Sequence, residues 1–266
     1  MEHVLAEARQ LADSGVKELI VIAQDITRYG MDWDGKPHLA DFLEELCKLD
    51  FHWIRLHYLY PEWIDDRLID VIAREDKILK YLDIPLQHCN DKILKKMNRR
   101  GDKKYLCALL DKLRERIPGL VLRTSIIAGL PGEGEEEFDE LCDFLREQKL
   151  LRAGVFPYSP EEGTRAAKME RVDSDEAARR AERIVDIQSE IIDAWNDERQ
   201  GDVMEVLCEG FDGQSMLFVG RSYAESPDID GRIYFSAPRD VAAGEFVPVR
   251  ITGAMDGELT GELAEE

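Results

Sequence analysis

Residues 120–133, with the sequence LVLRTSIIAGLPGE, decide the fold class of this 266-residue chain. The first nine of them are mostly apolar or β-branched, which predicts a buried strand. Two glycines and a proline then end the strand, and the acidic, periodic residues 135–147 predict a helix. A buried strand that leads directly into a helix is half of a βαβ unit. We therefore expect an α/β fold with a parallel sheet.

The same alternation of strand and helix recurs on both sides of this segment. Strands are expected at 17–23, 51–60, 79–84 and 151–156, and helices at 39–49, 62–74, 91–97 and 103–116. Together these elements predict an α/β domain over residues 1–172. Right-handed crossovers of such units build either a barrel or an open doubly wound sheet, and spacing along the sequence does not choose between them.

The character of the sequence changes after residue 160. Residues 173–200 predict one long helix, with Asp173 or Ser174 as its N-cap. Beyond this helix, short β-rich runs separated by glycine occur at 203–208, 215–221, 231–235 and 246–253. Short strands with regular turn signals predict a small β-barrel over residues 201–266.

The charge balance is strongly acidic. Lys and Arg number 35 against 56 Asp and Glu, a net charge of −21. Residues 201–266 alone hold 14 Asp and Glu, four Arg and no Lys, a net charge of −10. Such a surface repels nucleic-acid phosphates and favours a basic protein partner. The plainer alternative is that acidic groups only keep the protein soluble.

The five cysteines are too dispersed for a compact metal site or a disulfide framework. They are Cys47, Cys89, Cys107, Cys142 and Cys208. No apolar run reaches the roughly 20 residues of a membrane span, and no signal-peptide pattern opens the chain. We expect a cytoplasmic protein with reduced thiols and no membrane partner. Because residues 1–8 already read as an amphipathic helix, the chain is expected to begin inside a fold.

Polar residues gather where the predicted strands end. They are Gln24, Asp25, His57, Gln87, His88, Glu133 and Tyr158. In parallel α/β folds this edge binds ligands, because the strand-to-helix loops converge there. The alternative is that strand ends are simply where exposure to solvent begins.

Several features of this edge allow more than one interpretation. Glycines at 129 and 132 could bring backbone close to a ligand, or could form an ordinary strand-to-helix turn. Arg123 lies inside an apolar strand, so its guanidinium needs an acidic partner from a ligand or from the protein. The two histidines could act as acid–base groups or be structural. A nucleophilic Cys89 is rejected because no Asn or Asp is placed to complete the arrangement.

Five motifs then occur in the order found in the radical-SAM methylthiotransferases. They are ELIVIAQDITRYG at 18–30, DIPLQH at 83–88, MNRR at 97–100, LRTSIIAGLPGE at 122–133 and YSPEEGT at 158–164. Residues 201–266 resemble the TRAM domain of that family. The resemblance covers essentially the whole chain, and five motifs in order make it specific.

The resemblance implies a partial (βα)6, TIM-like radical-SAM barrel that lacks its first strand, at 1–172. A connecting helix at 173–200 and a small all-β TRAM barrel at 201–266 follow. It also implies two 4Fe-4S clusters, whose cysteines belong to an N-terminal domain and to a CxxxCxxC loop, both upstream of Met1. By this resemblance the chain itself holds no metal site and is catalytically incomplete alone.

The resemblance implies S-adenosyl-L-methionine (SAM) as cofactor, and it assigns no catalytic residue. Around the SAM and substrate end of the barrel it places Gln24, Asp25, Gln87, Arg123, Gly129, Glu133 and Tyr158. Arg123 could pair with the methionine carboxylate of SAM, and the 129–133 turn could approach the adenosine.

The family has two branches, which modify either a tRNA adenosine or the β-carbon of an aspartate in a small-subunit ribosomal protein. The tRNA branch typically reads Tyr-Ser-x-Arg-x-Gly-Thr where this chain has YSPEEGT, and Gln-Ser where this chain has Gln87-His88. The acidic TRAM segment also disfavours tRNA and favours a basic ribosomal protein. We therefore expect the aspartate branch. The alternatives are the tRNA enzyme, a substrate-binding module without catalysis, and an unrelated aldolase-type barrel.

Overall fold

The structure is a computed structural model that describes residues 1–264. The chain divides into two compact units, Met1–Gln188 and Ser189–Glu266. Each unit has its own sheet, and the two are described separately below.

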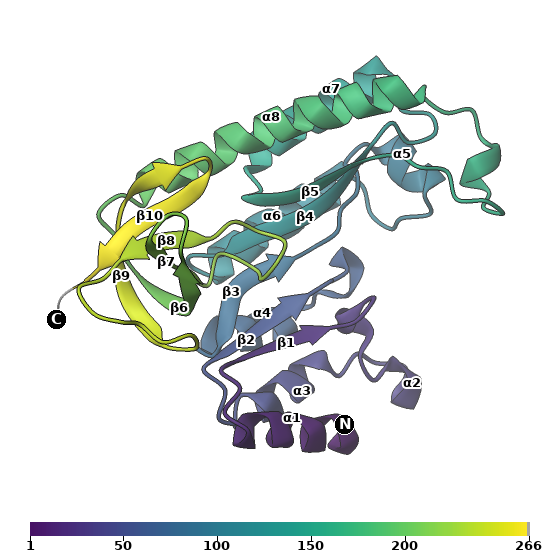
Figure 1. The fold of residues 1–266 in the computed structure, drawn as a ribbon. Helices are drawn as coiled ribbons and strands as arrows, with labels where there is room; N and C mark the ends of the chain where they lie inside the picture. Colours follow the sequence, from purple (N-terminus) through teal and green to yellow (C-terminus); the bar gives the residue numbers. More distant parts are fainter. Residues whose placement is uncertain (265–266) are drawn as a thin grey trace. The chain divides into compact units, whose positions relative to one another are not determined.

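The first unit is built on a five-stranded parallel sheet (Figure 1). Its strands are β1 (Glu18–Ile22), β2 (Trp53–His57), β3 (Ile78–Asp83), β4 (Val121–Ala128) and β5 (Arg152–Pro157). The order across the sheet follows the chain, from β1 to β5. Right-handed crossovers that always move in one direction place their helices on one face, as in a barrel, whereas a doubly wound sheet reverses direction. The sequential order therefore selects the partial barrel.

Helices connect the strands close to the predicted positions. They are α1 (Glu2–Asp13), α2 (Met31–Asp34), α3 (Leu39–Leu46), α4 (Asp66–Arg74), α5 (Asp91–Lys96), α6 (Lys103–Arg116) and α7 (Glu135–Gln148), with 3₁₀ turns η1 (Ile26–Arg28), η2 (Pro61–Trp63) and η3 (Ala166–Lys168). Side chains of Asp65, Asn90 and Asp102 accept backbone N–H groups at the starts of α4, α5 and α6. These caps stabilise short helices that would be marginal alone.

The long helix α8 (Ser174–Glu198) begins as the sequence predicts. The carboxylate of Asp173 accepts the N–H of Asp175 at 2.9 Å, so Asp173 is the N-cap. Ala177, Ile184 and Ile187 are buried at helical spacing. The residues of α8 up to Gln188 belong to the first unit, and those from Ser189 to the second.

The second unit is a closed five-stranded barrel. Its strands are β6 (Val203–Asp212), β7 (Leu217–Arg221), β8 (Ile233–Ser236), β9 (Phe246–Met255) and β10 (Glu258–Leu263). Val206, Phe235 and Val249 lie fully buried in its core. The sequence does not predict the last strand, because one glycine and three polar residues among its six leave it little apolar signal. It pairs antiparallel with β9 and parallel with β8, and so closes the barrel. Among the described residues, no helix is both long and apolar enough to cross a membrane.

Candidate functional site

One face of the first sheet carries charged side chains in place of an apolar layer. Arg55 of β2 is fully buried and donates from Nε to the Glu18 carboxylate of β1 at 2.7 Å. Its guanidinium also lies 4.7 Å from the centre of the Tyr81 ring on β3. Buried charges need such partners, so this pairing fixes the register of three neighbouring strands.

A second layer of charge lies nearer the carboxyl ends of the strands. Asp83 is fully buried, and its Oδ2 accepts a hydrogen bond from Nη1 of Arg123 at 2.9 Å. Nδ1 of His57 lies 3.3 Å from the same oxygen. The acidic partner that Arg123 required is therefore a residue of the neighbouring strand. The other carboxylate oxygen of Asp83, Oδ1, has no hydrogen-bond partner among the described residues. A buried polar atom of this kind leaves room for a further donor.

Beyond this charged layer the same face opens to solvent. Ile22 at the end of β1 is 59% exposed, and Phe156 on β5 is 54% exposed. Phe156 lies opposite Ile127 in the sheet register, and Ser125 and Ile127 are half-buried. An apolar layer above a charged layer can hold a ligand that combines a planar or apolar part with polar groups.

Gln87 and Tyr158 border this open layer. Gln87 adopts a positive φ of 68° and pairs with β4, donating its N–H to Ser125 and accepting from Ile127. The N–H of Tyr158 donates to the carbonyl of Ala128 at 2.8 Å. The hydroxyl of Tyr158 is buried and has no hydrogen-bond partner among the described residues.

Gln24 and Asp25 follow β1 but differ in their surroundings. Gln24 is exposed. Asp25 accepts the N–H of Thr27 at 3.0 Å, as well as its hydroxyl, and so caps η1. Asp25 thus has a local structural role, and a contact of either residue with a ligand stays a prediction.

Glu133 has partners inside the first unit. Its Oε1 accepts the N–H of Gly129 and Nη1 of Arg180, each at 2.9 Å, and its Oε2 lies 3.4 Å from Nε2 of His88. Burial raises the pKa of Glu133, but the contacts with His88, Arg180 and Gly129 outweigh it, so the pKa lies below the ordinary 4.5. The carboxylate therefore stays charged while it joins the turn to α8.

Gly129 is required by close packing. A Cβ atom there would lie 2.4 Å from Cβ of Ala177 on α8, and its φ is +82°. This geometry agrees with the interpretation of 129–133 as a strand-to-helix turn. Cofactor contacts of Gly129 and Glu133 stay predictions.

His88 and Cys89 are both buried beside this turn. Nδ1 of His88 accepts the N–H of Asn90 at 3.0 Å, so a neutral His88 carries its proton on Nε2, facing Glu133. Burial, and then the nearby Glu140 carboxylate, raise the pKa of the Cys89 thiol. A thiol held protonated is a poor nucleophile, which agrees with the sequence argument against a catalytic cysteine.

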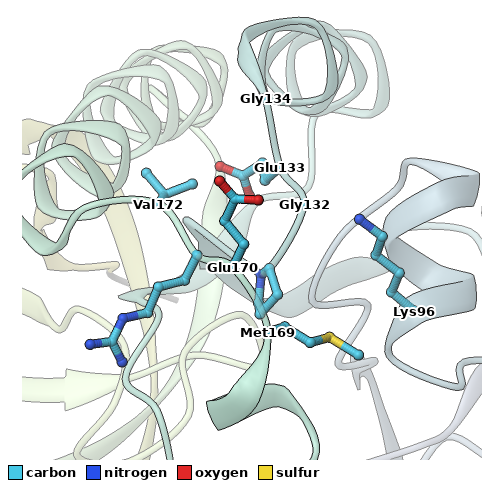
Figure 2. A pocket seen from close by; sticks show the side chains of 9 residues that line it. Lys96, Gly132, Glu133, Gly134, Met169, Glu170 and Val172 are labelled. Atoms are coloured by element: carbon cyan, nitrogen blue, oxygen red, sulfur yellow. The ribbon is translucent and has the colours of Figure 1, made fainter.

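A pocket of about 550 Å³ lies next to the turn (Figure 2). Its lining residues are Lys96, Pro131, Gly132, Glu133, Gly134, Met169, Glu170, Arg171 and Val172. Nζ of Lys96 lies so close to Gly132 that a Cβ atom there would be 1.7 Å away. Sequence reasoning missed Lys96 and the 169–172 segment. The sequence offers a signal for Lys96, which directly precedes the MNRR motif, but residues 169–172 belong to none of the five motifs.

Metal ligands do not cluster in the part of the chain that the structure describes. No group of three or more His, Cys, Asp or Glu in residues 1–264 could hold a metal ion. Cys89, Cys142 and Cys208 are buried, and Cys47 and Cys107 are half-buried. The residues described here therefore do not fit an iron–sulfur cluster.

Comparison with known proteins gives consistent matches along the chain. The Radical SAM superfamily matches residues 1–145, and the TRAM domain matches residues 201–264. Curated relatives named "Ribosomal protein uS12 methylthiotransferase RimO" include those of Symbiobacterium thermophilum (47% identical, all of this chain and 56% of the relative) and Pelotomaculum thermopropionicum (48% identical, 98% of this chain and 60% of the relative). The chain thus spans a little over half the length of these relatives.

A solved structure supports the fold assignment. Coproporphyrinogen III oxidase (HemN) from Escherichia coli, described as a radical SAM enzyme, superposes with a TM-score of 0.53 and 18% identity. The superposition covers 71% of this chain and 46% of the HemN chain. At this identity the likeness concerns the fold alone. The sequential order of the parallel sheet agrees with this fold, and the superfamily match over residues 1–145, more than half of the chain, shows that the chain belongs to the radical SAM superfamily.

Proposed function

We propose that this chain is the barrel and TRAM portion of a radical-SAM methylthiotransferase that modifies an aspartate β-carbon of ribosomal protein uS12. One observation carries the proposal. Relatives that share the name "Ribosomal protein uS12 methylthiotransferase RimO" are 43–48% identical over 98–100% of this chain. Identity of that extent includes both units.

The open layer of the first unit fits SAM in its chemistry. SAM combines a planar adenine with a charged amino-acid group, and this face combines exposed Ile22 and Phe156 with the Asp83–Arg123 pair below them. The unpartnered hydroxyl of Tyr158 and Oδ1 of Asp83 could take polar groups of the ligand. When bound, SAM would supply radical C–H activation and the transferred methyl group, while the protein binds and orients. Gln24, Asp25, Gln87, Gly129 and Glu133 remain proposed contributors.

The acidic second unit is proposed to dock uS12. Exposed Phe211 (53%) and Met216 (69%) lie at the β6–β7 hairpin, where Phe211 packs edge-on against Phe218 at 5.2 Å between ring centres. Apolar anchors in residues 201–266, a segment with a net charge of −10, suit a basic protein. Affinity for uS12 is expected to fall steeply as salt rises, because surface charge pairs are screened. An affinity for tRNA above that for uS12 would favour the tRNA branch instead.

A chimera tests the activity. Residues 1–266 replace the matching segment of the Symbiobacterium thermophilum relative, and the chimera is expressed in a host that lacks its own uS12 methylthiotransferase. Mass spectrometry of uS12 should show methylthioaspartate. A folded chimera that leaves uS12 unmodified, while the parent enzyme modifies it, would contradict the proposal. Methylthioadenosine in tRNA would point to the alternative branch.

Two variants of the same chimera test the SAM site. Tyr158→Phe removes only the unpartnered hydroxyl, and Tyr223→Phe in the second unit is the matched control. SAM binding measured by calorimetry should weaken about five- to tenfold in the first variant, since one hydrogen bond is worth about 1 kcal/mol. Equal affinity of the two variants would remove Tyr158 from the site.

A further inference from the structure

A basic segment stands out from this acidic protein. Residues 92–104, KILKKMNRRGDKK, hold seven Lys and Arg against one Asp. The segment covers most of α5, the start of α6 and the turn between them. Such a local excess of positive charge, in a chain with a net charge of −21, is not explained by solubility alone.

Only part of this charge is neutralised within the protein. Lys92 pairs with Glu137 at 3.0 Å, and Lys103 pairs with Glu140 at 3.2 Å, both partners lying on α7. The remaining five cations have no ion-pair partner among residues 1–264. They are Lys95, Lys96, Arg99, Arg100 and Lys104, of which all except half-buried Arg99 are exposed. We call these five residues the basic rim.

Aromatic rings lie against the two arginines of the basic rim. The guanidinium of Arg99 lies 4.8 Å from the centre of the Tyr60 ring, and that of Arg100 lies 5.8 Å from the Trp63 ring. Tyr105, 38% exposed, donates its hydroxyl to the carbonyl of Pro61 at 2.8 Å. An arginine held against a ring loses less conformational freedom when it binds an anion, so these contacts prepare the surface for binding.

The turn that presents the two arginines has a defined shape. Asn98 and Gly101 both have positive φ, of 57° and 88°. A Cβ atom on Gly101 would lie 2.6 Å from the Tyr105 ring. Asp102, the one acid of the segment, is occupied as the N-cap of α6. The turn is therefore fixed by its own backbone and by ring packing.

The basic rim lies at the edge of the sheet where the open layer is found. Tyr60 and Trp63 follow the carboxyl end of β2, and α5 follows that of β3. Figure 1 shows α5 and α2, which follows β1, at the same end of the sheet. A partner held on this rim would stand at the entrance to the SAM layer.

We propose that the basic rim binds single-stranded or loop RNA through its phosphates. Cations interleaved with aromatic rings are the pattern with which proteins hold single-stranded nucleic acid, because phosphates pair with the cations and bases stack on the rings. An acidic peptide could pair with the cations but would not use the rings. The proposal rests on the proposed function and extends it. The acidic unit would bind the ribosomal protein, and the basic rim would bind the RNA that accompanies that protein.

Anisotropy of a labelled, unstructured RNA of about 20 nucleotides, titrated with the intact chain at varied salt, tests the proposal. The variant Lys95→Gln/Arg100→Gln/Lys104→Gln spares half-buried Arg99. The matched control, Lys48→Gln/Arg146→Gln/Arg183→Gln, removes the same charge elsewhere. The rim variant should bind at least about tenfold more weakly at low salt, and its slope of log affinity against log salt should fall by about 2. Thermal unfolding verifies that both variants are folded.

Three results would overturn the proposal: no RNA binding by the unmodified chain, equal loss in the rim and control variants, or equal displacement of RNA by polyglutamate of the same charge. The last would make the rim an acidic-peptide site. None of these results bears on whether the chimera modifies uS12, so failure here is distinguishable from failure of the proposed function.

Discussion

Glu133 joins three separate parts of the first unit at one carboxylate. It accepts hydrogen bonds from the Gly129 N–H of its own turn and from Arg180 of α8, and it lies beside the ring of His88. The sequence suggests only a polar residue after a strand. Arg180 is 47 residues away and reaches Glu133 only because α8 returns to the turn.

The lowered pKa of Glu133 has a consequence for stability at low pH. A carboxyl whose folded pKa lies below its unfolded value stabilises the fold fully above the unfolded value. That stabilisation is lost as pH falls below about 4.5 and through the folded value. The difference in free energy of unfolding between the unmodified chain and Glu133→Gln, measured in urea, should therefore be large at pH 7 and shrink near about pH 3. Glu7→Gln, at an exposed position, is the control, and a difference independent of pH would contradict the expectation.

The contact between Gly129 and Ala177 predicts coupled mutations. Gly129→Ala should destabilise the chain by about 1–3 kcal/mol, because the new methyl group meets Cβ of Ala177 and φ is positive. Ala177→Gly alone should cost about 1 kcal/mol of helix propensity. The double variant should be more stable than the sum of the single costs, which urea unfolding of all four proteins would show. Strict additivity would mean that the two residues do not clash.

At the scale of elements, single side chains close the ends of helices in the first unit. Nζ of Lys80 on β3 donates to the carbonyls of Ile72, Ala73 and Glu75 at the end of α4, at 2.9 Å for Glu75 and 3.3 Å for Ala73. Burial lowers the pKa of Lys80. A cation at a helix carboxyl terminus satisfies carbonyls that have no partner within the helix.

Replacing that cation tests the link between β3 and α4. Lys80→Met keeps the length of the side chain but removes all three donated bonds, and should lower the free energy of unfolding by about 1–3 kcal/mol. Lys48→Met, at an exposed lysine, should change it by less than about 0.5 kcal/mol. Comparable losses for the two variants would show that the bonds from Lys80 contribute nothing.

At the scale of the whole molecule, charge is distributed unevenly. The net charge of −21 coexists with the basic rim, and residues 201–266 hold about half of the excess of acid. At 0.1 M salt, screening confines the interactions of each exposed charge to other charges within about 10 Å. The total charge therefore predicts the electrostatic behaviour of neither the basic rim nor the second unit.

Self-repulsion should make stability depend on salt. Raising sodium chloride from low to about 0.15 M should raise the urea midpoint, because screening weakens repulsion among the acids. The variant Glu2→Gln/Asp228→Asn/Asp240→Asn/Asp256→Asn carries four fewer negative charges and should show a smaller shift. A midpoint that falls with salt, or equal shifts for both proteins, would contradict this.

The sequence by itself determined the alternation of strands and helices, the position of α8, the family and the polar residues at the strand ends. These properties follow from local periodicity, caps and motifs, which act within a few residues. Only the tertiary structure decided the sheet order, the partner of Arg123, the packing of Gly129 against α8, the closure by β10 and the stacking of the rim arginines on Tyr60 and Trp63. Each depends on residues brought together from distant parts of the chain. Arg123 is 40 residues from Asp83, and the pair forms because β3 and β4 are neighbours in the sheet.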